Sequence, residues 1–289
     1  MTYLLLALSA CDSDPMAESW QVDRLRVLAV ASEPAEPRPG DIVQFDALVV
    51  SPAAPVAGSA WFVCDGASSD DFGCAIDPSL LETGDPTTLD PAALEAAGFI
   101  GFLPLMPPTW QVPADYLDTL AEADRAEGTF AMTYIAAIPE LPEGEELDED
   151  DVELAYKRVP VSLAATPNHN PTIARWRVDD LPVAAGAEVV LDAGQAYDIA
   201  VDLADGAVET YLYTPDGGVE QSRTEEPYLT WYAQEGSYNQ TDTLWPVATV
   251  VYFAPDAPTL QTQSLWVVVR DRRGGMGWSE LRIRVREPG

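Results

Sequence analysis

The feature that most constrains this chain is a series of short segments in which apolar and polar residues alternate, separated by turn residues. Ile42 to Val50 (IVQFDALVV) is the clearest example in the first half, and Leu265 to Val285 contains two such segments around Gly274 and Gly275. Alternation with a period of two is typical of strands that bury one face. The chain has 289 residues, enough for one large domain or two modest ones. We therefore predict a mainly β protein.

The pattern changes between residues 77 and 128, where Asp90 to Ala97 and Pro113 to Glu127 both have the spacing of helices. We expect residues 20–166 to form an N-terminal β-sandwich-like domain, with a short helical insertion at about 77–128. Residues 167–289 contain many short predicted strands and almost no helix, which favours a second β-sandwich.

Acidic residues dominate the composition, with 48 Asp and Glu against 15 Lys and Arg and a net charge of −33. Such a field repels phosphate backbones and argues against a nucleic-acid partner. Residues up to 167 contain 6 basic and 30 acidic residues (net −24), and the rest contain 9 and 18 (net −9). We expect the first domain to stand off an anionic membrane surface and the second domain to meet a partner.

Residues 1–10 (MTYLLLALSA) are apolar and end in small side chains, and Cys11 follows at the start of a polar tether over residues 11–19. Leu8 to Cys11 resemble the lipobox of bacterial lipoproteins. This resemblance implies that residues 1–10 are a signal segment and that Cys11 carries an acyl anchor. The alternative is an apolar first strand with a buried cysteine.

A lipid anchor at Cys11 would place the protein in the cell envelope, on the periplasmic or surface face of the outer membrane or on the inner membrane. No apolar run reaches the roughly 18 residues of a transmembrane helix. We therefore expect contact with the membrane through the anchor only.

The chain has three cysteines, and an odd number in an exported protein leaves one without a disulfide partner. If Cys11 is acylated, Cys64 and Cys74 remain as a pair, which we expect to form a disulfide. A metal site is the alternative, but two cysteines and one histidine fall short of the four ligands of structural zinc.

The second half is similar to bacterial Ig-like and PKD-like domains of exported and cell-surface proteins. The matching features are the opening Asn170 and Pro171, the Gly186 turn before residues 189–191, the aromatic run 229–232 with Gly236 and Ser237, Phe253 to Pro255, and the terminal hairpin 265–285. This resemblance implies a sandwich fold and says nothing about activity. The first half resembles the N-terminal part of uncharacterised envelope lipoproteins of Gram-negative bacteria.

Candidate chemical groups are few. His169, the one histidine, lies in a PNHNP segment where we expect a linker, and the chain has no Gly-x-Ser-x-Gly motif for a nucleophile. The acidic run 143–151 offers Asp148, Asp150 and Asp151 as weak calcium ligands. It lacks the spacing of an EF-hand loop, and charge runs are usually solvated surface. We therefore expect no cofactor, with calcium as the one candidate.

Four aromatic residues are candidates for a stacking surface that binds sugar or peptide: Tyr228, Trp231, Tyr232 and Tyr238. Because neighbouring residues of a strand point to opposite faces, at least one of Trp231 and Tyr232 is expected in the core. The other would face outward and form a binding patch with its neighbours.

These observations favour a non-catalytic role as a binding or scaffolding component of the envelope. Its partner would be an envelope protein or a polysaccharide. One alternative is a calcium-dependent or carbohydrate-binding accessory module. Another is a hydrolase that uses a pair of carboxylates, since acidic residues are abundant.

Overall fold

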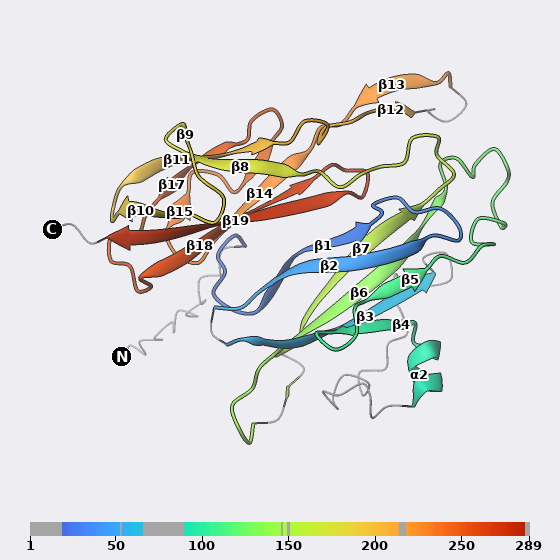
Figure 1. Cartoon of the computed structure of the whole chain (residues 1–289), viewed down its shortest axis with the longest axis horizontal. Coiled ribbons are helices and arrows are strands. Elements are labelled where there is room, and N and C mark those ends of the chain that lie inside the picture. Colours follow the sequence, from blue (N-terminus) through green and yellow to red (C-terminus); the bar gives the residue numbers. More distant parts are fainter. Residues whose placement is uncertain are drawn as a thin grey trace, which may run out of the picture.

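The computed structural model describes residues 19–52, 54–65, 90–145, 147–148, 151–213 and 218–286. Its strands form two β-sandwiches and a separate two-stranded ribbon (Figure 1). The predicted fold class, mainly β with two β-sandwiches, is confirmed. In this described part of the chain, no helix is long and apolar enough to cross a bilayer.

The first sandwich packs a three-stranded sheet, in the order β1-β2-β5, against a four-stranded sheet, in the order β4-β3-β6-β7. Its strands are β1 (Arg26–Glu33), β2 (Ile42–Val50), β3 (Val56–Asp65), β4 (Phe99–Leu103), β5 (Thr109–Gln111), β6 (Thr129–Pro139) and β7 (Glu153–Val161). Val43 and Phe45 of one sheet meet Trp61 and Ile135 of the other in a buried core. The alternation seen in the sequence of β2 is the burial of one face against this core.

The central strand β6 is buried on both faces, which explains its nearly continuous apolar sequence. Ile135 faces the sandwich core, whereas Ala136 and Ile138 belong to a second cluster with Phe62 and Phe102. Helix α2 (Pro91–Ala96) leads into β4, whose Phe99 packs at the edge of this cluster.

The predicted helical insertion is only partly correct. Asp90 caps α2 by accepting a hydrogen bond from Ala92 N–H at 3.0 Å, as its position before Pro91 suggests. The predicted helix over 113–127 is wrong, because this segment is a series of turns closed by bonds between residues three apart. The side chain of Arg125 donates to the carbonyl oxygen of Leu120 at 3.3 Å. In a helix this oxygen would accept a hydrogen bond from a backbone N–H.

The strands β4 and β5 also lie inside the segment expected to be helical. They pair with β3 and β2 respectively, so the segment completes both sheets of the first sandwich. Their partners lie more than thirty residues away in sequence, and a short apolar run gives no sign of such pairing.

The second sandwich packs a sheet in the order β10-β19-β18-β14-β16 against one in the order β15-β17-β11-β8-β9. The first of these sheets contains β10 (Glu188–Asp192), β14 (Tyr228–Ala233), β16 (Asp242–Leu244), β18 (Thr262–Arg270) and β19 (Met276–Arg286). The second contains β8 (Ile173–Val178), β9 (Leu181–Pro182), β11 (Ala196–Leu203), β15 (Ser237–Tyr238) and β17 (Thr249–Phe253). The ribbon is β12 (Thr210–Tyr213) paired with β13 (Gln221–Thr224).

The core of the second sandwich contains Trp231, which is fully buried, and Trp176, whose ring lies 6.0 Å from it in an edge-to-face contact. The predicted hairpin is present: Arg270 pairs with Met276, and residues 271–275 form the loop. Along β19, Leu281 and Ile283 point into the core while Arg282 and its alternate neighbours are exposed. The period of two in the sequence is this difference between faces.

An apolar cluster joins the two sandwiches, and we call it the apolar joint. It is made by Val22, Leu28, Ala29 and Val50 from the N-terminal part, with Tyr232, Trp266 and Val268 from the second sandwich. The residues before β1 lie against the second sandwich, since Val22 N–H donates to Ala233 O at 2.8 Å and the Trp20 ring packs on Tyr238. The segment at Trp20, expected in the first domain, therefore runs along a strand of the second.

Candidate functional site

The loop between β18 and β19 carries the polar half of the contact between the sandwiches. The side chain of Asp271 folds back over this loop, and its Oδ1 accepts hydrogen bonds from the backbone N–H of Arg273 at 2.7 Å and of Gly275 at 2.9 Å. A side chain at position 275 would place its Cβ 2.0 Å from Asp271 Oδ2 and 2.7 Å from His169 O. Glycine is therefore required at this point for the loop to close on the linker between the domains.

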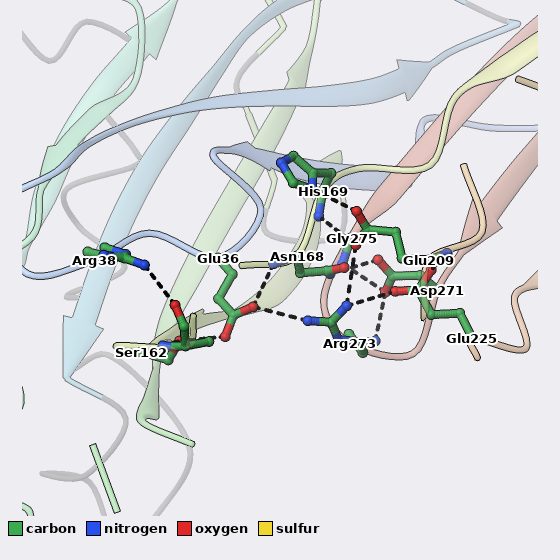
Figure 2. A network of polar contacts seen from close by, with 11 residues as sticks. Glu36, Arg38, Ser162, Asn168, His169, Glu209, Glu225, Asp271, Arg273 and Gly275 are labelled. Carbon is green, nitrogen blue, oxygen red and sulfur yellow. Dashed lines mark hydrogen bonds and ion pairs between the residues drawn. The ribbon is translucent and has the colours of Figure 1, made fainter. Parts of the chain in front are cut away.

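Arg273 projects from this loop into a group of three carboxylates from different parts of the chain (Figure 2). Its Nη1 lies 3.1 Å from Glu225 and 3.3 Å from Glu209, and its Nη2 lies 3.4 Å from Glu36. Glu36 belongs to the loop between β1 and β2, whereas the other two flank the ribbon. One guanidinium therefore connects the first sandwich, the terminal hairpin and the base of the ribbon. We call these four residues the Arg273 network.

The network is largely shielded from water. The side chain of Arg273 is 16% exposed, and those of Glu36 and Glu225 are 11% and 1% exposed. Burial raises the pKa of the Glu225 carboxyl, an effect opposed by the N–H bond from Glu209 and by the Arg273 charge. Buried carboxylates are tolerated when such charge-assisted bonds satisfy them. The arrangement has the character of a structural clamp.

Lys157 is a second buried cation at the same contact. It lies on β7 with 5% exposure, and its ammonium donates to the carbonyl oxygen of Gly274 in the terminal hairpin. Burial lowers the pKa of Lys157 to about 8, although the charge of Asp271 acts in the opposite direction. Burial likewise raises the pKa of Asp271, against the effect of its bond from Asn168. The first sandwich thus inserts a charged group into the loop of the second.

The linker between the sandwiches is held by two asparagines. Asn168 N–H donates to Glu36 at 2.7 Å, and its side chain donates to Asp271 at 2.7 Å. Asn170 donates to Ser32 O at 2.8 Å and accepts from Met276 N–H at 2.9 Å. Each asparagine therefore bonds to both sandwiches, which fixes the path of the linker.

His169 lies between these asparagines, in the linker position expected from the sequence. Its side chain is 72% exposed, and Nδ1 lies 2.7 Å from Glu209 Oε1. The imidazole therefore contacts the outer edge of the Arg273 network.

The aromatic residues chosen from the sequence do not assemble into one exposed face. Trp231 is fully buried in the second core, and Tyr232 is 8% exposed in the apolar joint. Tyr238 packs against the second core and donates from its hydroxyl to Tyr232 O at 3.0 Å. Tyr228 lies beneath Arg270 and Arg272, whose guanidinium carbons are 5.6 and 5.8 Å from its ring centre. Each of these four aromatic rings therefore contacts other residues of the protein.

An outward aromatic pair occurs elsewhere, on the outer face of β6 and β7. Tyr134 and Tyr156 are cross-strand partners with ring centres 6.2 Å apart, and Tyr156 is 66% exposed. Leu154 on the same face is 65% exposed. The alternation in the sequence of β7 carried this signal, because Leu154 and Tyr156 lie two residues apart.

The remaining predicted site residues fall partly outside the described chain. Asp148 N–H donates to the Asp151 carboxylate at 3.0 Å in a turn of their own, and Asp150 is not among the described residues. No group of three potential ligands arranged to hold a metal occurs in the part of the chain that the structure describes. Cys11 and Cys74 also lie outside the described residues, and half-buried Cys64 is the residue before Asp65, the last residue of β3.

Sequence reasoning missed the Arg273 network entirely. Its residues lie at positions 36, 209, 225 and 273, and no local motif connects such distant positions. Two signals were available: the sole lysine of the chain falls inside an alternating strand, and the terminal hairpin has the unusual turn DRRGG. Either could have indicated a charged contact, but neither identifies the partners.

Comparison with known proteins assigns the chain to no family. No family model matches it, and no curated protein does. Among solved structures it is similar to the fibronectin(III)-like modules of Clostridium thermocellum CbhA, with 10% identity, a TM-score of 0.23, and 90% of this chain and 95% of that chain covered. It is also similar to the N-terminal Ig1-2 module of Drosophila receptor protein tyrosine phosphatase DLAR, with 10% identity, a TM-score of 0.27, and 91% and 100% covered. Likeness at this level carries no argument about activity.

Proposed function

We propose that this chain is an exported, lipid-anchored and non-catalytic component of the bacterial envelope that binds or holds a partner. The observation that carries the proposal is the contact between the two sandwiches. It combines the apolar joint with the buried Arg273 network, so that both apolar and charged groups resist separation. A protein that holds a partner in a fixed position needs this kind of rigid connection.

The charged groups of this contact support a structural role over a catalytic one. Arg273, Glu225 and Asp271 are each engaged by protein groups on more than one side. A catalytic acid or base needs an approach for substrate within hydrogen-bond reach. Here the polar atoms face one another and the linker, which favours a clamp between domains.

The anchor and the disulfide are further parts of the proposal. Cys11 in the lipobox-like segment would carry the acyl group, and a Cys64–Cys74 disulfide would close the segment that follows β3. Both are supported by the sequence and by the number of cysteines.

The anchor is tested by fractionating cells that express the full chain. Wild-type protein should be found with membranes and released by detergent, whereas Cys11→Ala should move to the soluble fraction. Mass spectrometry should find acyl groups on Cys11 and no residues 1–10. Soluble wild-type protein that retains Met1 would contradict the anchor and leave the binding role untouched.

The binding role is tested by cross-linking intact cells and recovering the full chain through an affinity tag. Wild-type protein and the exposed-surface control Ile42→Ser should recover the same envelope components. The variant Trp266→Ala opens the apolar joint and should lose them while both sandwiches stay folded. If wild-type protein recovers no more than an unrelated lipoprotein, the binding role is wrong.

A further inference from the structure

The ribbon of β12 and β13 stands apart from both sandwiches (Figure 1). Within the described chain, these two strands pair only with each other. All four residues of β13 are exposed, and Leu212 of β12 is 58% exposed. An isolated two-stranded ribbon is marginally stable in water, so one that extends from a domain needs support at its base.

That support comes from the Arg273 network. Glu209 and Glu225 are the residues at the base of the ribbon, and both pair with Arg273. The Arg273 guanidinium carbon also lies 4.1 Å from the centre of the Tyr211 ring. The same clamp that joins the sandwiches therefore fixes the direction of the ribbon, which is held in place before any partner arrives.

The charge of the ribbon differs from that of the chain around it. The eight residues of β12 and β13 include no acidic residue and one basic residue, Arg223, in a chain of net charge −33. Exposed edge strands are usually protected from pairing by charged residues, proline or a covering segment. β13 has one charge and no proline, and its four side chains are uncovered.

The register shows which backbone groups of the ribbon point outward. Glu225 N–H donates to Glu209 O at 2.9 Å, so this pair exchanges hydrogen bonds within the ribbon. Antiparallel pairs alternate, and the pairs Thr210 with Thr224 and Leu212 with Ser222 are therefore of the other kind. The N–H and C=O groups of Ser222 and Thr224 point away from β12, toward the free edge of β13.

Two occupants could pair with this edge: a second copy of the chain or a segment of another protein. Two copies each carry a charge of −33 and repel one another, which disfavours pairing of ribbon with ribbon. The same charge repels an acidic segment, and Arg223 at the edge does not suit a basic one, so an uncharged segment fits this edge best.

We propose that the free edge of β13 binds an extended, uncharged segment of another protein as an added β-strand. The inference rests on the proposed binding role and specifies how the partner is bound. The outward groups of Ser222 and Thr224 supply the main-chain bonds, and Arg223 of β13 lies beside the added strand.

The test uses fluorescein-labelled peptides and the purified full chain in detergent. The three peptides have the sequences TVEVTVEV, TVSVTVSV and TVKVTVKV with blocked ends. Fluorescence anisotropy should show saturable binding of the uncharged peptide TVSVTVSV and at least tenfold weaker binding of the acidic and basic peptides. If the uncharged peptide does not bind, or if the charged peptides bind as tightly, the proposal is wrong.

A pair of variants distinguishes the role of the backbone edge of β13 from that of the Ser222 side chain. Ser222→Pro removes one outward N–H without breaking a bond inside the ribbon, and should weaken peptide binding at least tenfold. Ser222→Ala keeps that N–H and should bind within twofold of wild type. Circular dichroism and the melting temperature check that both variants are folded. Equal binding by Ser222→Pro and wild type would overturn the proposal.

Two further measurements distinguish the competing occupants and the two proposals. Light scattering at increasing concentration should show a monomer, and a dimer abolished by Ser222→Pro would mean that a second copy occupies the edge. Recovery of envelope components from cells should fall with Ser222→Pro and persist with Ser222→Ala. Undiminished recovery with Ser222→Pro would leave the binding role standing and the ribbon edge wrong.

Discussion

Arg273 and Glu36 are 237 residues apart in the sequence, yet Nη2 of the arginine lies 3.4 Å from Oε2 of the glutamate across the contact between the sandwiches. The same guanidinium binds Glu209 and Glu225 at the base of the ribbon. The position of the first sandwich and the direction of the ribbon are therefore coupled through one side chain. A change at Arg273 should affect both.

The first prediction concerns the free energy of unfolding when this charge is removed. Arg273→Gln leaves Glu36, Glu209 and Glu225 without their shared cation and should cost about 3–5 kcal/mol. Urea unfolding followed by tryptophan fluorescence measures the loss. Arg284→Gln is the matched control, because Arg284 pairs with Glu188 at the surface and should cost less than about 1 kcal/mol. Equal effects would show that the network contributes no more than a surface pair.

The second prediction concerns the pH dependence contributed by Lys157. Its pKa of about 8 lies below the ordinary value of 10.5, so the unfolded chain binds more protons between these values. Stability therefore rises with pH from about 8 to 10.5 as the ammonium loses its proton, and below about 8 the cost of burying the charged form is fully present and no longer changes with pH. Unfolding curves of wild type and Lys157→Met should diverge in wild type's favour over that range. Parallel curves would mean that the ammonium is not buried in solution.

The third prediction concerns the close approach of Gly275 to Asp271. Gly275→Ala places a Cβ 2.0 Å from the carboxylate oxygen, so the loop must shift and its bonds must break. We expect a cost of about 2–4 kcal/mol from the lost buried bonds and the clash. Gly186→Ala is the control, since its added Cβ has no neighbour within 4 Å and only the positive φ is strained. It should cost about 1 kcal/mol, and a similar cost at both positions would contradict the packing argument.

The fourth prediction concerns the cooperativity of the two sandwiches. Because the apolar joint buries Trp266 and Val268 against the first sandwich, wild-type protein should unfold in a single calorimetric transition. Trp266→Ala opens a cavity in the joint, and two transitions should appear as the sandwiches unfold separately. Two transitions already in wild type would show that the joint does not couple the domains.

The fifth prediction concerns the cysteines that follow β3. If Cys64 and Cys74 form a disulfide, the oxidised protein should be about two mass units lighter than the reduced protein, and reduction should lower its stability by about 3 kcal/mol. Cys74→Ser should be insensitive to reductant. Identical masses with and without reductant would exclude the bond.

The strands that were predicted correctly are those whose burial differs between faces. β2 and β19 alternate in sequence because one face of each meets a core and the other meets water or a different neighbour. The segment 113–127 was misassigned because Tyr116, Leu117 and Leu120 have a helix-like spacing. In the structure they reach the core from successive turns. The spacing of apolar residues indicates which side chains are buried. It does not show whether a helix or a series of turns places them in the core.

The sequence by itself determined that this is an acidic, mainly β chain with a terminal hairpin, because charge and period-two burial are local properties of the residues. Only the tertiary structure decided that Lys157 and Glu36 meet the loop at 271–275 and that Trp20 runs beside β14. It also decided that β13 pairs with β12 alone among the described strands. Those relationships join residues far apart in the chain. They depend on how two separate sandwiches pack, and no short stretch of sequence encodes that arrangement.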